Sequence, residues 1–254
     1  MPHKNVIFFG STGCGKSSVV NMILGKEKAS ISSGAKGCTF STTEYKTRID
    51  EVDYSLYDTA GLDEGKEGTI VSDKALRNLC NLVRLLSKDG VNLLVFVFRV
   101  PMRITEAVEN NYRIFYEGFC AKGVPIVIVI TGLENEQPMS DWWLGNKAEF
   151  NNRGLKFEAS ACITATRGRK DKDGGYINED EYNFSRELVK DLIRSKCSEE
   201  GWKKPRQKWV VRCWRWIRNT FTPIVGAVLG WVVEFRNIKR VVAEILGDDE
   251  GGDV

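Results

Sequence analysis

Eight residues near the start of the chain, Gly10 to Ser17, have the types and spacing of a phosphate-binding loop. They read Gly-Ser-Thr-Gly-Cys-Gly-Lys-Ser and match the pattern GxxxxGK[ST] at every fixed position. In such a loop the backbone N–H groups surround a β-phosphate, and the N-terminus of the following helix adds partial positive charge. Lys16 is expected to bridge the β- and γ-phosphates, and the Ser17 hydroxyl to coordinate Mg²⁺. The residues predicted to bind a nucleotide here are Gly10, Ser11, Thr12, Gly13, Cys14, Gly15, Lys16, Ser17 and Ser18.

A second motif, Asp58-Thr-Ala-Gly61, places an acid at the end of a predicted strand. DxxG alone is a weak signal because ordinary turns share it, but together with a P-loop it indicates a magnesium-nucleotide switch. Asp58 is expected to hold a Mg²⁺-bound water, and the Gly61 N–H to meet the γ-phosphate. A hydroxyl between the motifs completes the Mg²⁺ shell, and we favour Thr39 over Thr42. The predicted catalytic residues are Lys16, Thr39 and Gly61, and the predicted metal ligands are Ser17, Thr39 and Asp58.

The base is expected to lie at the ends of the last two strands, where the chain reads Thr131-Gly-Leu-Glu134 and Thr164-Ala-Thr166. A carboxylate at Glu134 can accept both donors on the Watson–Crick edge of guanine, which adenine cannot match without leaving a group unpaired. The Ala165 N–H can donate to the guanine carbonyl. The usual pattern here is [NT]KxD, and this chain has Gly132 in place of the lysine and Glu in place of Asp. Glu134 as a solvated loop acid is the alternative. The predicted base contacts are Thr131, Gly132, Glu134, Thr164 and Ala165.

Alternating strands and helices must position these motifs. Apolar runs predict strands at residues 5–9, 44–49, 52–57, 91–98, 124–130 and 159–165. Helical spacing predicts helices at 16–24, 76–86, 104–120 and around 188–193, and 167–176 reads as an exposed loop. The runs at 91–98 and 124–130 are apolar throughout, as in strands covered on both faces. The sequence therefore predicts an α/β fold with a doubly wound, mostly parallel sheet and ligands at the carboxyl ends of its strands.

Composition restricts the function classes and shows where charge collects. Residues 1–200 carry 27 Lys and Arg against 28 Asp and Glu, residues 201–247 carry 10 against 2, and the last seven residues add 4 acids. The single histidine, His3, excludes His-based nucleophilic triads and His-rich metal sites from the body of the chain. Seven scattered cysteines form no CxxC pair, and no targeting pattern precedes the first strand. We expect a reduced protein, cytoplasmic or peripheral on the cytoplasmic face of a membrane.

The segment 201–254 is expected to be a basic, tryptophan-rich helical tail, separable from a nucleotide-binding domain at 1–200. Four tryptophans between 202 and 216 interleave with seven basic residues between 203 and 218, and fifteen uncharged residues follow at 219–233. That run is short of the roughly 18–20 residues that a spanning helix needs. Three interpretations stay open: a helix at an anionic membrane interface, a helix docked on the domain, and contact with nucleic acid or another partner. Basic and aromatic residues together do not establish RNA or DNA binding.

These motifs together resemble the septin-like branch of the TRAFAC GTPases, which includes septins, GIMAP-type immunity-associated GTPases and chloroplast import-receptor GTPases. The wording Val-Ile-Thr-Gly-Leu-Glu, followed by Met-x-Asp-Trp-Trp at Met139 to Trp143, is most similar to a group of fungal G-domain proteins. The resemblance covers about residues 4–196. It implies GTP or GDP with Mg²⁺ as cofactors, slow hydrolysis, and nucleotide-dependent pairing of G domains into a homodimer or oligomer.

The position after DxxG bears on catalysis. Many fast switch GTPases have a Gln there that orients the attacking water, whereas this chain has Leu62. Hydrolysis is therefore expected to be slow, unless a partner or a second G domain supplies the missing group. Two function classes remain: a slow GTPase, and a GTP-regulated assembly or membrane-associated scaffold module with negligible hydrolysis.

Overall fold

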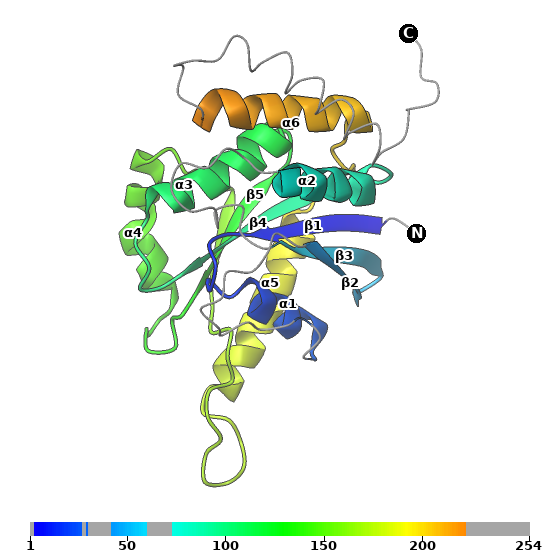
Figure 1. Cartoon of the computed structure of the whole chain (residues 1–254). Coiled ribbons are helices and arrows are strands. Elements are labelled where there is room, and N and C mark those ends of the chain that lie inside the picture. Colours follow the sequence, from blue (N-terminus) through cyan, green and yellow to red (C-terminus); the bar gives the residue numbers. More distant parts are fainter. Residues whose placement is uncertain (1–2, 27–28, 30–41, 60–72, 222–254) are drawn as a thin grey trace.

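The computed structural model describes residues 3–26, 29, 42–59 and 73–221 of the 254 residues (Figure 1). The strands are β1 (His3–Phe9), β2 (Thr42–Ile49), β3 (Val52–Thr59), β4 (Leu93–Arg99), β5 (Ile126–Thr131) and β6 (Ala159–Cys162). The helices are α1 (Lys16–Leu24), α2 (Asp73–Leu86), α3 (Glu106–Tyr112), the π-helix η1 (Arg113–Phe119), α4 (Ser140–Asn152), α5 (Glu179–Lys196) and α6 (Arg206–Phe221).

The six described strands form one sheet in the order β2-β3-β1-β4-β5-β6. Neighbouring strands are parallel except β2 and β3 at one edge, which are antiparallel. The expected doubly wound, mostly parallel α/β sheet is therefore confirmed. Because β1 lies between β3 and β4, the loop that follows β1 leaves the sheet where the carboxyl ends of its parallel neighbours meet.

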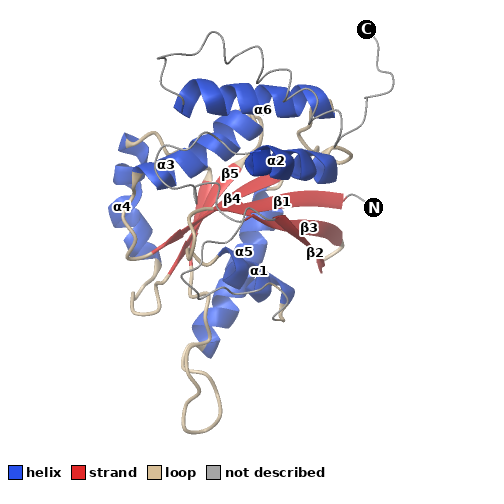
Figure 2. Cartoon of the chain, in the orientation of Figure 1, coloured by secondary structure: helices blue, strands red, loops and turns tan. Residues whose placement is uncertain are grey.

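Helices cover both faces of this sheet: α2, α3 and α6 lie on one side, and α1 and α5 on the other (Figure 2). Successive side chains of a strand point to opposite faces, so β1 sends Ile7 and Phe9 into the first layer and Val6 and Phe8 into the second. All four are fully buried. A central strand between two helical layers buries both of its faces, which explains the continuous apolar runs in the sequence.

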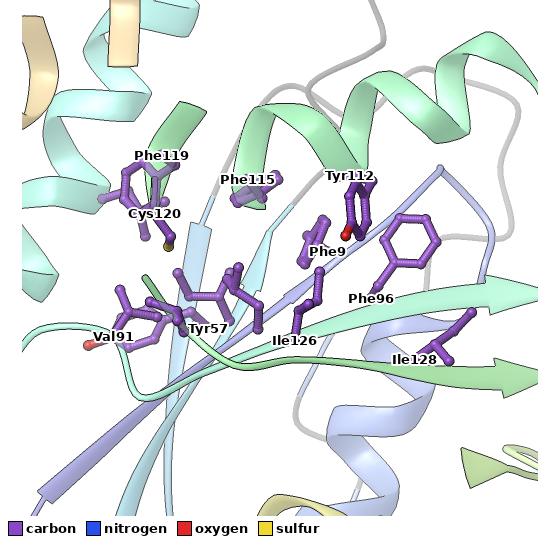
Figure 3. Packing of buried hydrophobic residues seen from close by; sticks show 14 of the residues in the cluster. Phe9, Tyr57, Val91, Phe96, Tyr112, Phe115, Phe119, Cys120, Ile126 and Ile128 are labelled. Atoms are coloured by element: carbon purple, nitrogen blue, oxygen red, sulfur yellow. The ribbon is translucent and has the colours of Figure 1, made fainter. Parts of the chain in front are cut away.

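Aromatic rings fill much of the first layer (Figure 3). Phe9 at the end of β1 packs against Phe115 with ring centroids 4.5 Å apart, and against Phe96 of β4 at 5.3 Å. Phe96 in turn meets Tyr112 edge-on at 6.3 Å. These contacts fix α3 and η1 over the strands that carry the predicted phosphate loop.

The helix expected at 104–120 is present but changes type. It begins at Glu106 because the Thr105 hydroxyl accepts the Val108 N–H and caps it. From Arg113 it widens into η1, and the Cys120 N–H reaches back five residues to the Phe115 carbonyl at 3.0 Å. An apolar pattern cannot distinguish these two helix types, because both bury one face.

Two further elements differ from the sequence expectation. β6 ends at Cys162 rather than at residue 165, because the Thr164 N–H donates to the Ser185 hydroxyl on α5 at 3.0 Å and so leaves the sheet. Helix α4 was not expected. It buries only Trp143 and Phe150, while Leu144 is 73% exposed, so its sequence lacks a continuous apolar stripe.

Helix α6 docks on the domain. Its Trp209 is 1% exposed, and the indole Nε1 donates to the Phe119 carbonyl of η1 at 2.8 Å. The Trp216 ring lies over Gly118, where a Cβ would come within 2.6 Å of it. The docked interpretation of the tail therefore holds for residues up to 216, and the stretch from Ile224 onward lies outside the described residues. Within the described part of the chain, no helix is long and apolar enough to cross a bilayer.

Candidate nucleotide-binding site

The loop between β1 and α1 depends on three glycines with positive φ: Gly10 at +146°, Gly13 at +75° and Gly15 at +96°. A Cβ at Gly10 would lie 2.3 Å from the Val97 carbonyl oxygen, so only glycine lets the loop pass this close to β4. Gly15 is the N-cap of α1 and carries no side chain that could cap the first turn. The N–H groups at this helix start therefore remain directed toward the loop, as anion binding requires.

The loop encloses the charge of Lys16. The lysine is 8% exposed, and its Nζ donates to the carbonyl oxygens of Gly10 and Ser11, each at 3.0 Å. Neutral carbonyls solvate the ammonium without neutralising it, so a positive charge is held where phosphates are expected. Burial raises the pKa of the neighbouring Cys14 thiol more than Lys16 lowers it. Cys14 is thus a neutral, buried loop residue rather than a reactive thiolate.

Ser17 and Asp58 form the candidate metal site. The Ser17 hydroxyl donates to Asp58 Oδ2 at 2.6 Å, and the register pairs Asp58 of β3 with Phe8 of β1, which brings the carboxylate beside the loop. Burial raises the pKa of Asp58, and the Ser17 hydrogen bond and the Lys16 charge lower it. A hydroxyl and a carboxylate in contact at a helix start are hard oxygen donors of the kind Mg²⁺ prefers, so these residues fit the expected ion.

The end of β5 is hydrogen-bonded to the phosphate loop. Thr131, predicted as a base contact, is buried, and its hydroxyl donates to the Cys14 carbonyl at 2.8 Å. The threonine therefore positions the loop, a role that its place in the sequence does not reveal. Gly132 follows with φ +83°, Leu133 is fully buried, and Glu134 is half-buried in a turn closed by a hydrogen bond from the Glu136 N–H to the Leu133 carbonyl.

The turn after β6 lies next to this one. The fully buried Thr164 hydroxyl contacts Met139 Sδ at 3.4 Å, so this side chain is used in packing. Ala165 follows it and is half-buried. Met139 belongs to the Met-x-Asp-Trp-Trp segment, whose Trp143 packs in the core. The segment therefore packs against the turn after β6 through Met139.

One residue at the site was missed by the sequence interpretation. Arg99, the last residue of β4, is exposed, and its Nη1 donates to the Gly13 carbonyl at 3.3 Å. Its only sequence signal was a charge directly after a buried apolar run, which also marks any ordinary strand end.

The structure brings Lys16, Ser17, Asp58 and Thr131 together around the loop. Thr39 and Gly61 lie outside the described residues, as does Leu62, so their predicted roles stay predictions. Six cysteines lie in the described residues, and none of them forms a disulfide there.

Comparison with known proteins identifies the fold and the family. Residues 5–131 match the model of a family described as "50S ribosome-binding GTPase". The chain is 28% identical over 197 residues to GTPase Der of Campylobacter curvus (strain 525.92), covering 78% of this chain and 37% of that protein. It is 27% identical over 203 residues to immune-associated nucleotide-binding protein 7 of Arabidopsis thaliana, covering 77% and 63%. The chain thus spans less than two thirds of the length of these curated relatives.

Among solved structures, a chain of the chloroplast translocon components atToc33 and psToc159 aligns with a TM-score of 0.51 at 19% identity, covering 76% of this chain and 83% of that one. This likeness supports the fold alone. The GTP or GDP expected from the sequence agrees with the family match.

Proposed function

This chain belongs to the family of 50S ribosome-binding GTPases, and we propose that it binds Mg-GTP through the loop at Gly10–Ser17, hydrolyses it slowly, and self-associates in a nucleotide-dependent way. Its finer placement, in the septin-like branch beside fungal G-domain proteins, is part of this proposal and rests on the amino-acid sequence around Thr131–Trp143. The division into a G domain at 1–200 and a basic tail at 201–254 is also proposed.

The observation that carries the proposal is the charge arrangement around α1. Among the described residues, the buried Lys16 ammonium has neutral carbonyl oxygens and the Cys14 sulfur as its hydrogen-bond partners, and the next residue, Ser17, contacts the Asp58 carboxylate. An anion above the helix start and a divalent cation beside Ser17 would satisfy both groups together. A magnesium-bound polyphosphate has this charge pattern.

In this arrangement the residues of the chain have separate tasks. Lys16 moves from the loop carbonyls to the β- and γ-phosphate oxygens, and the glycine N–H groups hold the β-phosphate. Ser17 and Asp58 would hold Mg²⁺, Ser17 through its hydroxyl and Asp58 through a water. The bound ion would supply neutralisation of phosphate charge. Thr39 and Gly61 complete the γ-phosphate contacts as proposed ligands.

Guanine is the base that the turns after β5 and β6 suit best. The half-buried Glu134 carboxylate can accept two donors from guanine, and the Ala165 N–H can donate to its carbonyl. Gly132 and the longer acid depart from [NT]KxD, so guanine preference rests on Glu134.

Slow hydrolysis follows from Leu62, whose side chain cannot orient a water. A second copy of the G domain can supply the missing group, and for the translocon components named above dimerization is important for GTPase activity. We therefore expect hydrolysis to accelerate when two copies meet.

Single-turnover GTP hydrolysis at rising protein concentration tests this function. The observed rate should be low and then rise with concentration, and Lys16→Ala should abolish it by removing nucleotide binding. Lys26→Ala, an exposed lysine just after α1, is the matched control. A folded Lys16→Ala variant with unchanged GTP affinity would refute the phosphate site.

The second candidate is a GTP-regulated, membrane-associated scaffold with negligible hydrolysis. The observation in its favour is the outer face of α6, where Lys208, Arg212 and Arg215 are exposed and no acid occurs in the helix. Hydrolysis that stays undetectable at every concentration, while GTP still binds, would favour this candidate.

A further inference from the structure

The ends of β4 and β5 both reach the phosphate loop. Arg99 and Thr131 are register partners across the two strands. Arg99 Nη1 donates to the Gly13 carbonyl at 3.3 Å, and the Thr131 hydroxyl donates to the Cys14 carbonyl at 2.8 Å. Two adjacent strand ends therefore hold two successive carbonyls of the loop. The turn that is expected to contact the base, here called the base-side turn, begins immediately after Thr131 at the end of β5.

The backbone at Gly132 explains why a lysine is absent from that position. Gly132 has φ +83°, and a Cβ built on it would lie 2.4 Å from the Val100 carbonyl oxygen. Both the conformation and the contact exclude any side chain. The same Cβ would lie 3.3 Å from Arg99 Cγ. The stem of Arg99 thus runs beside the position where [NT]KxD carries its lysine.

We propose that Arg99 replaces that lysine: its stem and guanidinium cover one face of the guanine base, and the guanidinium ties the loop at Gly13 to the base-side turn. This inference rests on the proposed guanine site. A guanidinium is planar and stacks on aromatic rings, and it donates in a fixed fork, so one arginine can serve both contacts. Arg99 is exposed, so its outer atoms are accessible to a base.

Isothermal titration with GDP, a non-hydrolysable GTP analogue and ATP, each with Mg²⁺, tests the assignment. Arg99→Ala should weaken GDP and the GTP analogue about tenfold and equally, which is one lost contact of about 1.4 kcal/mol. Arg99→Met should keep part of the affinity because it retains an apolar stem. Arg99→Lys should keep most of it. Arg84→Ala, an exposed arginine on α2, should leave all three affinities unchanged.

The same variants separate the proposal from its rivals. GDP affinity of Arg99→Ala equal to that of the unaltered chain would overturn it. A loss confined to the GTP analogue would also overturn it, since the arginine would then serve the γ-phosphate. If Arg99→Met loses as much nucleotide affinity as Arg99→Ala while Arg99→Lys keeps the affinity of the unaltered chain, the residue only tethers the loop and the base contact is refuted. An unaltered chain that binds ATP as tightly as the GTP analogue would instead refute the guanine site itself.

Discussion

At the scale of single residues, the site combines groups that are costly to bury. Lys16 Nζ donates to two carbonyl oxygens, and Asp58 accepts a hydrogen bond from the Ser17 hydroxyl. Burial disfavours the charged form of the Asp58 carboxyl unless a partner compensates it. A phosphate next to Lys16 and a cation next to Asp58 supply that compensation, so binding and local stability are linked at these positions.

Asp58→Asn should stabilise the nucleotide-free chain and weaken the Mg²⁺-dependent part of GTP binding. Burial raises the pKa of Asp58 above its ordinary value of 3.8, so the folded chain retains a proton that the unfolded chain has released. The stability that the protonated Asp58 carboxyl contributes is therefore lost as pH rises from 3.8 through the raised pKa. The amide removes this loss while still accepting from Ser17. Between pH 4 and 8, the thermal midpoint of Asp58→Asn should be higher than that of the unaltered chain and should depend less on pH.

GTP affinity of the same variant, measured with Mg²⁺ and with EDTA, completes the test. The advantage conferred by Mg²⁺ should shrink at least about tenfold, because a carboxylate that orients the metal shell is lost. Asp53→Asn, near the start of the same strand, should change neither the thermal midpoint nor the effect of Mg²⁺ on GTP affinity. A variant that keeps the full Mg²⁺ advantage would exclude Asp58 from the metal site.

Glu134→Ala should weaken GTP more than ATP, by roughly 10- to 100-fold, because two charge-assisted hydrogen bonds to the base are lost in a half-buried, partly hydrated position. Glu136→Ala, an exposed acid two residues further along the same turn, is the control. Competition binding against a fluorescent GDP gives the ratio directly. Equal losses for both nucleotides would mean that Glu134 does not recognise the base.

At the scale of elements, η1 and α6 depend on each other. The π-helix presents the Phe119 carbonyl to the Trp209 indole, and Gly118 leaves room for the Trp216 ring. Val91, just before β4, also forms an isolated antiparallel bridge with Trp202, in the segment before α6. The tail therefore completes the layer that covers β1, β4 and β5, up to at least residue 216.

Trp209→Ala should destabilise the chain by about 3–5 kcal/mol, since it removes a large, fully buried ring from the core. Trp209→Phe keeps most of the ring volume but leaves the Phe119 carbonyl without its indole donor, so it should cost about 1–3 kcal/mol. Urea unfolding of the full chain measures both. An unfolding midpoint of Trp209→Ala equal to that of the unaltered chain would show that α6 is not docked in solution.

Because α6 packs in the core, deletion of the tail cannot test its role in membrane binding. Deleting residues 201–254 would remove Trp209, Val210, Cys213 and Trp214 from the core, so a loss of GTP binding in that variant would report unfolding. Substitutions on the outer face of α6 avoid this problem.

At the scale of the whole molecule, the loop between β1 and α1 lies at the carboxyl ends of the parallel strands, and α6 lies on the outside of one helical layer (Figure 1). The basic side chains Lys208, Arg212 and Arg215 of α6 are exposed. Lys208, Arg212 and Arg215 are spaced four and three residues apart, so they share one face of the helix. The uncharged run at 219–233 follows in the sequence. A basic helix followed in the sequence by an uncharged run suits binding to an anionic surface, because such a surface attracts the cations first.

Replacing Lys208, Arg212 and Arg215 by Glu should abolish co-sedimentation of the full chain with phosphatidylserine vesicles, leaving GTP affinity unchanged. Each cation near such a surface contributes about 1 kcal/mol, and the attraction falls off within a Debye length of about 8–10 Å, so added salt should weaken it. The matched control replaces three exposed cations elsewhere, Lys147, Arg169 and Lys172, by Glu. If the unaltered chain ignores both anionic and neutral vesicles, the membrane role fails.

The sequence by itself determined the layered fold and the phosphate loop, because both depend on local patterns. Strand and helix periods can be read over short windows, and the loop needs its glycines and Lys16 in consecutive positions. The helix at Lys16–Leu24 was predicted to the residue. α4 escaped prediction because its sequence lacks a continuous apolar stripe. η1 was predicted only as part of one longer helix, because its apolar pattern does not distinguish a π-helix from an α-helix.

Only the tertiary structure decided which side chains meet. The hydrogen bond from Thr131 to the phosphate loop was not part of its predicted role as a base contact, which stays a prediction, and Arg99 was not predicted at all. Both contacts join residues far apart in the sequence, 117 and 86 positions, at the ends of neighbouring strands. The docking of α6 likewise depends on Gly118 and the Phe119 carbonyl, which lie far from it in sequence. Sequence spacing specifies what a segment can do, whereas the register of the sheet determines which neighbour it finds.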